Sequence, residues 1–376
     1  MLGYGALSLS SCSTRTTIVL QKFRCNPLLL ERFRRRELSA TSTSSRATER
    51  GNGPAVSSVP DPRNQKVLHA AIAGLPNSGK STLLNYVVGD KVSAVSTKRH
   101  TTRENTLGVM TVGTAQVFFH DTPGFVSHEE RGDYQPALSA ASREAIELVN
   151  LTLLLVDASK DVTKRGLRSL TGLLEKALRS RCELFLVLNK VDMVNPKHRL
   201  LTTTDDIMDR AQEIMDQIDR ERAEAAVEIP PFSEGGKTVD DHITVFMVSA
   251  KTGDGVEDIV DILVNRARPG SWLFGREETT NKDKRSRVME IVREGLYKHL
   301  YKELPYQVKT QIKEMSRKPD GSVSILQDLR VERTSQKSIV LGKLRHIKKD
   351  VEWDLRKLFG TRTDVRFSVI GGHKKG

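Results

Sequence analysis

The sequence predicts an α/β chain with a doubly wound sheet that carries a phosphate-binding loop, followed by a smaller α+β domain. Two observations predict the first part: the octapeptide GLPNSGKS at residues 74–81 lies between apolar runs, and strand-like and helical stretches alternate up to about residue 268. A third observation, two strand-like runs within a basic segment after residue 284, predicts the second part.

The glycine loop follows the first predicted strand, at residues 67–73, and opens a predicted helix at 79–88. Backbone N–H groups of such a loop wrap phosphate oxygens, and the helix N-terminus adds positive dipole. We expect Lys80 to reach the β- and γ-phosphates and the Ser81 hydroxyl to bind Mg²⁺. The predicted nucleotide-binding residues of the loop are Gly74, Leu75, Pro76, Asn77, Ser78, Gly79, Lys80, Ser81 and Thr82.

The next predicted strands, at 105–111 and 115–120, lead into the segment DTPGF. Asp121, at the end of a strand beside the loop, can hold Mg²⁺ through water, and the Gly124 N–H can contact a γ-phosphate and release it after hydrolysis. The predicted contacts of this segment are Asp121, Thr122, Pro123, Gly124 and Phe125.

The polar segment KRHTTRE at 98–104 offers two threonines that can complete the Mg²⁺ shell when the segment closes over GTP. Thr101 and Thr102 both qualify, and we expect Thr102 to be the ligand. The predicted metal ligands are therefore Ser81, Thr102 and Asp121.

The nucleotide base is predicted from the ends of two later strands, at 183–189 and 243–248. In NKVD the Asp192 carboxylate can accept from guanine N1–H and N2–H₂, a donor pair that adenine lacks, so a guanine nucleotide is expected. We expect Asn189 to reach the far edge of guanine, the Lys190 stem to cover the ring, and a backbone N–H in the SAK segment to serve guanine O6. The predicted base contacts are Asn189, Lys190, Val191, Asp192, Ser249, Ala250 and Lys251.

The remaining elements of the first part are a strand at 151–156 and helices at 136–149, 164–179 and 255–266. Residues 201–240 interrupt the alternation and predict a surface insertion, in which residues 206–225 have helical periodicity.

Charge is unevenly distributed along the 376 residues, whose net charge is +13. Residues 282–376 hold 24 Lys and Arg against 12 Asp and Glu, which indicates a polyanionic partner or, alternatively, an ordinary solvated basic surface.

Residues 1–60 begin Arg-rich and acid-poor and end Ser/Thr-rich, which favours an organelle transit peptide and connector over a plain tail. The three cysteines have no pair spacing, which argues against disulfides and zinc.

Taken together, the motifs resemble those of the Era-like GTPases. GLPNSGKS, HTTR, DTPGF, NKVD and VSAKTGDG follow the order of that family, and the predicted helix at 288–306, ending in ELPY, and the segment VERTSQKSIVLGK resemble its KH domain. The resemblance covers roughly residues 65–376. It implies a GTPase, joined to an RNA-binding KH-like domain, that holds the 3′ end of small-subunit ribosomal RNA during assembly of the small ribosomal subunit.

Hydrolysis in this family needs a substitute for the glutamine that many GTPases place after the switch glycine, since Phe125 cannot hydrogen-bond to water. Relatives with GxPNxGKS are thought to hold a monovalent cation at the asparagine. Asn77 therefore either binds K⁺, which supplies positive charge to the transition state, or only caps the loop. The residues expected to take part in hydrolysis are Lys80, Thr102, Gly124 and Asn77.

The predicted KH-like domain departs from its family at the GxxG loop, which clamps the nucleic-acid backbone between two helices of an αββααβ pattern. Gly342 and Lys343 continue into Leu344 and Arg345 without a second glycine, so we expect a short loop there. Three alternatives follow: RNA binding is weak, Lys343, Arg345, Lys348 and Lys349 compensate electrostatically, or the sequence contains a gene-model or splicing error. The predicted RNA-binding residues are Arg333, Lys337, Gly342, Lys343, Arg345, Lys348 and Lys349.

The sequence thus favours a monomeric, GTP-hydrolysing RNA chaperone with Mg²⁺. The leader predicts import into an organelle. The resemblance to the Era-like family, together with the insertion, implies the mitochondrial matrix, with peripheral contact to the inner membrane, rather than the plastid. The alternative is a GTPase switch whose basic domain binds a protein or an anionic membrane surface; a tRNA-modification GTPase would need a further domain. The predicted divisions are a leader at 1–60, the GTPase domain at 61–268, a linker at 269–283 and the KH-like domain at 284–376.

Overall fold

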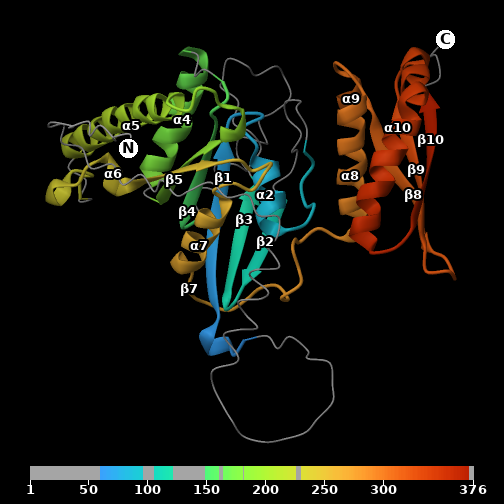
Figure 1. Ribbon diagram of the computed structural model, residues 1–376, viewed down its shortest axis with the longest axis horizontal. Helices are drawn as coiled ribbons and strands as arrows, with labels where there is room; N and C mark the ends of the chain where they lie inside the picture. The colour runs from blue at the N-terminus through green and yellow to red at the C-terminus, as the bar shows by residue number, and fades with distance from the viewer. Residues whose placement is uncertain are drawn as a thin grey trace, which may run out of the picture.

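The computed structural model describes residues 60–95, 106–121, 149–160, 164–180, 182–225 and 230–371, which form two domains, each built on its own sheet (Figure 1). The elements of the first domain are β1 (Lys66–Gly74), α2 (Lys80–Val88), β2 (Thr106–Val112), β3 (Ala115–Asp121), β4 (Leu151–Asp157), α4 (Lys164–Ser180), β5 (Glu183–Asn189), α5 (Arg199–Glu224), α6 (Val239–His242), β6 (Ile243–Val248), α7 (Val256–Arg266) and β7 (Arg268–Pro269).

The first sheet has the strand order β2-β3-β1-β4-β5-β6, with β7 paired to β1. Strands β3, β1, β4, β5 and β6 run parallel, while β2 is antiparallel to β3. Helices α2 and α7 bury their apolar side chains on one face, and α4 and α5 bury theirs on the other. The predicted strands and the doubly wound fold are confirmed, whereas the predicted helix at 136–149 lies almost entirely outside the described residues.

The predicted insertion at 201–240 differs from expectation in its first half. Helix α5 is 26 residues long, and its side chains Ile207, Ala211, Ile214 and Ile218 are buried in the same apolar cluster as α4 and β5. This spacing of four, three and four residues places the side chains on one helix face. The predicted helix is confirmed, but it covers the sheet rather than standing out as a surface excursion.

The second domain consists of α8 (Lys284–His299), α9 (Leu304–Gln307), β8 (Lys309–Arg317), β9 (Val323–Val331), α10 (Thr334–Phe359) and β10 (Thr363–Gly371). Strand β9 lies in the centre of its sheet, antiparallel to β8 and parallel to β10. Side chains of α8 and α10 bury one face of this sheet. Figure 1 shows the second domain beside helix α2, with α8 nearest to it. Within the described ranges, no helix is apolar over a length that could cross a membrane.

Two details of the second domain correct the sequence-based prediction. The helix expected at 288–306 starts earlier, where the Asp283 carboxylate caps it by accepting from the Ser286 N–H at 2.8 Å, and it ends at His299. More important, α10 runs unbroken from Thr334 to Phe359, so the expected loop between two helices is absent. No proline interrupts this stretch, and the single glycine, Gly342, weakens a helix by only about 1 kcal/mol.

Candidate nucleotide-binding site

The glycine loop joins β1 to α2, and two of its glycines are needed for close packing. Gly79 has φ +101°, and a Cβ added to it would lie 2.1 Å from Nδ2 of Asn189. Gly74 has φ +149°, and its Cβ would lie 2.4 Å from the carbonyl oxygen of Leu155. Only glycine fits both the backbone conformation and the space. The loop is therefore held against β4 and the end of β5.

Lys80 begins helix α2 and turns back over the loop. Its Nζ donates to the carbonyl oxygens of Gly74 and Leu75, each at 3.1 Å. Burial lowers the pKa of Lys80 to about 8, while the nearby Asp121 carboxylate acts in the opposite direction. Phosphate oxygens are stronger acceptors for an ammonium group than these carbonyls. The side chain is thus already positioned beside the loop that would hold the phosphates.

Ser81, Ser93 and Asp121 form a polar cluster beside the loop. Oδ2 of Asp121 accepts from the Ser81 hydroxyl at 3.2 Å and from the Ser93 hydroxyl at 3.0 Å. Burial raises the pKa of Asp121, although Lys80 and the two hydroxyls oppose this. Its Oδ1 is buried and, among the described residues, has no hydrogen-bond partner. Hydroxyl and carboxylate oxygens suit Mg²⁺, so Ser81 and Asp121 fit the predicted metal site.

Ser93 was not predicted from the sequence. It is buried, and its hydroxyl also lies 3.1 Å from that of Ser81. Asn85 of α2 fixes the segment that carries it, since the Asn85 Nδ2 donates to the Ser93 carbonyl and its Oδ1 accepts from the Ser93 N–H. A single serine outside any motif is not marked by its spacing in the sequence. Its position beside Ser81 and Asp121 is therefore seen only in the folded chain.

Asn189 connects three segments of the site. Its Nδ2 donates to the carbonyl oxygen of Ser78 at 2.7 Å, and its Oδ1 accepts from the N–H groups of Lys190 at 2.8 Å and Ala250 at 2.9 Å. The side chain is buried. The structure therefore places the Asn189 amide between the glycine loop and the SAK segment. The expected contact of Asn189 with the far edge of guanine stays a prediction.

Lys190 reaches from the base segment to the glycine loop. Its Nζ donates to the carbonyl oxygen of Asn77 and to Oδ2 of Asp157, each at 2.7 Å. Burial opposes ionisation of Asp157, but hydrogen bonds from Lys190 and Ser159 hold the pKa of that carboxyl below its usual value. Asp157 was not predicted, although its place at the end of β4, next to β5, is a usable signal in a parallel sheet.

The residues predicted to contact the base lie at the ends of β5 and β6. Asp192 is exposed in the short turn Val191–Met193, so its carboxylate is open to a ligand. Ser249 is buried and its carbonyl accepts from the Gly253 N–H at 2.7 Å, which shapes the turn that presents Ala250 and Lys251. The predicted residues Thr102, Thr122, Pro123, Gly124 and Phe125 lie outside the described residues.

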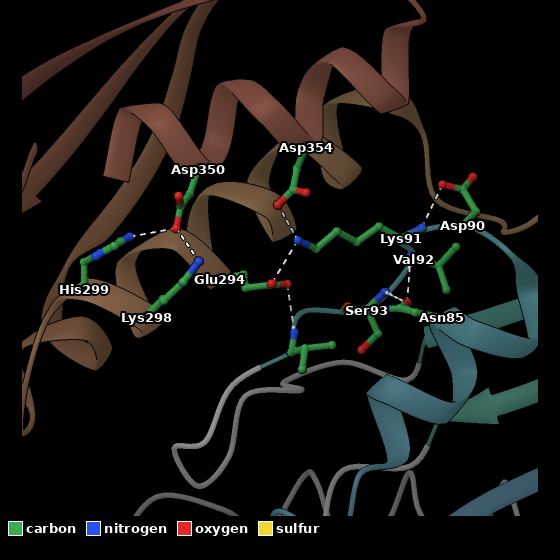
Figure 2. A network of polar contacts seen from close by, with 11 residues as sticks. Asn85, Asp90, Lys91, Val92, Ser93, Glu294, Lys298, His299, Asp350 and Asp354 are labelled. Carbon is green, nitrogen blue, oxygen red and sulfur yellow. Dashed lines mark hydrogen bonds and ion pairs between the residues drawn. The ribbon is translucent and has the colours of Figure 1, made fainter. Parts of the chain in front are cut away.

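The segment after α2 also bonds to the second domain. Lys91 lies between two carboxylates of that domain, 2.8 Å from Oε1 of Glu294 on α8 and 2.5 Å from Oδ2 of Asp354 on α10 (Figure 2). Glu294 accepts in addition from the Val95 N–H at 2.9 Å. Asp90 pairs with Arg287 of α8 at 2.5 Å. The stretch 90–95 therefore connects Ser93 of the polar cluster directly to α8 and α10.

The predicted RNA-binding residues take different places around α10. Lys348 is paired with Glu352 at 3.4 Å and Asp364 at 3.2 Å, and the Lys343 ammonium lies 5.9 Å from the ring of Tyr301. Arg333 lies just before the helix and Lys337 in its first turn. The remaining three, Gly342, Arg345 and Lys349, are exposed on the helix.

Comparisons with known proteins found similar chains. A family model described as 50S ribosome-binding GTPase matches residues 69–190. GTPase Era of Mesorhizobium japonicum is 37% identical over 273 residues, which cover 72% of this chain and 76% of that protein. GTPase Era of Bradyrhizobium sp. (strain BTAi1) is 35% identical, over 73% and 77%.

Solved structures show the same fold. Era in complex with MgGDPNP and nucleotides 1506–1542 of 16S ribosomal RNA has a TM-score of 0.64 at 24% identity, covering 82% of this chain and 95% of that chain. A variant of Aquifex aeolicus Era bound to GDP·AlF4⁻ has a TM-score of 0.62, also at 24% identity and with the same coverage.

Proposed function

The chain belongs to the Era family of GTPases and hydrolyses GTP, and we propose that its GTP cycle regulates binding to the 3′ end of small-subunit ribosomal RNA during assembly of that subunit. One observation supports this most: the segment 90–95 touches the polar cluster of the nucleotide site and also bonds to two helices of the basic domain. A related protein solved with 16S ribosomal RNA adds support.

We infer the role of each side chain in the nucleotide site from its position. With a bound nucleotide, the Lys80 ammonium would leave the carbonyl oxygens of the loop for the β- and γ-phosphates, and the N-terminus of α2 would face them. Ser81 and, through water, Asp121 would hold Mg²⁺, which screens the charge of the phosphates. Asp192 would select guanine. Asn189 and Lys190 hold the NKVD segment against the glycine loop, so that the base and phosphate contacts keep a fixed distance.

We propose further that K⁺ supports hydrolysis through the side-chain oxygen of Asn77. The Asn77 carbonyl oxygen of the backbone already accepts from Lys190, and the residue is held at φ +65°, so its side chain is the part available to a cation. We expect GTP turnover to be on the order of a hundredfold faster in KCl than in NaCl, the size typical of one preorganised contact to a transition state. Asn77→Ala should remove the difference, and equal rates for the unmodified chain in both salts would refute the proposal.

RNA binding is tested with the full chain and a labelled single-stranded RNA carrying the 3′-terminal small-subunit sequence. We expect binding that weakens steeply with salt, because phosphate contacts release counterions. A scrambled RNA and anionic vesicles serve as controls. Binding to vesicles but not to RNA would favour the alternative, a switch whose basic domain meets a membrane surface, and binding to neither would favour a protein partner.

We also propose import into the mitochondrial matrix, directed by the Arg-rich leader at residues 1–60. Fusion of this segment to a fluorescent reporter should carry the reporter into mitochondria. A cytosolic reporter would refute import, and a plastid reporter in plant cells would identify the other organelle. Peripheral contact with the inner membrane and a monomeric state are parts of the same proposal, tested by salt extraction of mitochondrial membranes and by light scattering of the purified chain.

A further inference from the structure

Helix α10 has one face that packs into the second domain and one that faces away from it. The buried side chains are Val340, Ile347, Val351 and Leu355, spaced seven, four and four residues apart. The side chains of Arg345, Lys349, Trp353 and Arg356 are spaced four, four and three residues apart and all are exposed. Such spacing places them on a common face of the helix, away from the buried one.

The acidic residues of α10 do not neutralise this exposed face, because each of them turns to a neighbouring element. Asp350 pairs with Lys298 at 2.5 Å and His299 at 2.9 Å on α8, and Asp354 pairs with Lys91 (Figure 2). Glu352 accepts from the Val365 N–H of β10 at 3.0 Å. The carboxylates therefore serve contacts within the fold and between the domains.

The cations of the exposed face lack such partners. Within the described ranges, neither Arg345, Lys349 nor Arg356 forms an ion pair or side-chain hydrogen bond, in contrast to Lys348, which has two carboxylates within 3.4 Å. A row of unpaired cations along one helix face fits a polyanion.

Trp353 stands within this row and is 61% exposed, which is rare for a large aromatic side chain. The Lys357 ammonium lies 5.2 Å from its ring centroid. An exposed indole offers a flat surface on which an unpaired base can stack, and lysines beside the ring can reach the phosphates on either side of that base. A folded membrane-binding face would need a wider apolar stripe than one aromatic residue among cations.

We propose that the row Arg345, Lys349, Trp353, Arg356 and Lys357, named the tryptophan row, binds single-stranded RNA by stacking a base on Trp353 and contacting the neighbouring phosphates. It takes the place of the GxxG clamp, whose position lies inside the continuous helix α10. The inference rests on the proposed binding of ribosomal RNA, and it adds where the RNA lies and which base contact holds it.

The two tryptophans of the chain allow a direct test. In the full chain with Trp272→Phe, Trp353 is the sole tryptophan. We expect single-stranded RNA to quench its fluorescence, and the RNA concentration at half-maximal quenching should equal that at half-maximal binding in a filter-binding assay. The reciprocal variant Trp353→Phe, in which Trp272 reports, should show no comparable quenching while it retains most of the affinity. Trp353→Ala should weaken RNA binding on the order of tenfold, the loss expected for one stacked base.

Charge variants test the phosphate contacts. Lys349→Ala and Arg356→Ala should each lower the slope of log affinity against log salt by about one, as expected for one lost phosphate contact. Lys309→Ala removes an exposed cation from β8 of the same domain and should leave slope and affinity unchanged. All these side chains are exposed, so melting temperatures should equal that of the unmodified chain.

The outcomes separate this inference from the proposed function. If the unmodified chain binds RNA but Trp353 is not quenched and Trp353→Ala binds equally well, the tryptophan row is not the RNA site and the proposed function stands. If the unmodified chain binds no RNA, the proposed function fails and this inference with it. Quenching of Trp353 by anionic vesicles instead of RNA would also overturn the inference.

Discussion

The nucleotide site and helix α10 differ in how their functional residues are connected. In the nucleotide site the motifs bond to one another: Asn189 holds Ser78 and Ala250, and Lys190 holds Asn77. A change in one motif therefore disturbs the others. On the outer face of α10 the side chains contact solvent, so each can change without damage to the fold. Substitutions should therefore have larger effects in the nucleotide site than on the outer face of α10.

The largest expected effect is in the connected site. Gly79→Ala would place a methyl group 2.1 Å from the Asn189 amide at a φ that alanine rarely adopts. We expect GDP affinity to fall at least about a hundredfold, or 2.7 kcal/mol, in a titration with fluorescent GDP. Gly113→Ala, at φ +58° with nothing within 4 Å of the added Cβ, should bind GDP normally. Equal GDP binding by the two variants would show that the motifs are not mutually dependent.

The next effect concerns the base. Asp192→Asn replaces two acceptor oxygens by an amide that also donates, which suits the C2 carbonyl of xanthine instead of the amino group of guanine. We expect affinity for GDP to fall and that for xanthosine diphosphate to rise, each by about 10- to 100-fold, since mismatched buried hydrogen bonds lose about 1–3 kcal/mol. Unchanged preference for GDP would mean that the exposed Asp192 does not touch the base. Calorimetry with both nucleotides measures this.

The connection between the two regions can be broken at Lys91. Lys91→Ala leaves Glu294 and Asp354 without their shared cation, and we expect the domain contact to weaken by about 1–2 kcal/mol, between the ranges for exposed and buried ion pairs. Protease cleavage within 269–283 should then accelerate about 5- to 30-fold. Lys298→Ala, which removes an ion pair inside the second domain, is the matched control. Equal cleavage rates in both variants would show that Lys91 does not hold the domains together.

The smallest effects are expected on α10 itself. Gly342→Ala fills open space in a helix and should raise the free energy of unfolding by about 1 kcal/mol. Arg345→Gly restores a GxxG spacing and should lower the free energy of unfolding by about 1 kcal/mol. Because α10 is continuous, we expect Arg345→Gly to weaken RNA binding only a few-fold, by the loss of one phosphate contact. A gain in RNA affinity would show that the clamp can form again.

Most of the fold and the centre of the site follow from local patterns. Apolar runs between turn residues predict the strands, and the motif spacing predicts that Lys80, Ser81 and Asp121 lie together, as their contacts show. Ser93 and Asp157 escaped prediction because their roles depend on neighbours 28 and 33 residues away in the chain. Asn189 was predicted as a site residue, but its bonds to the glycine loop depend on the packing of three strands.

The continuous helix α10 shows a different kind of error. The expected loop came from the family pattern, whereas the residues themselves, rich in Leu, Lys, Arg and Ile without proline, favour a helix. Likewise, the charge of 206–225 suggested a surface segment, although its apolar residues repeat on one face. In both places helical periodicity was the better guide.

Helix α10 is a rod of about 39 Å, since it has 26 residues at about 1.5 Å each. One flank is fastened to the GTPase domain through Asp354, and the other carries Trp353, the adjacent residue. Because α10 is unbroken, tension on a strand held at Trp353 would pass to the contacts that join the two domains. These include Lys91, which lies two residues before Ser93 of the polar cluster. Under the RNA binding that we propose, an RNA under load would therefore act mechanically on the segment that carries Ser93.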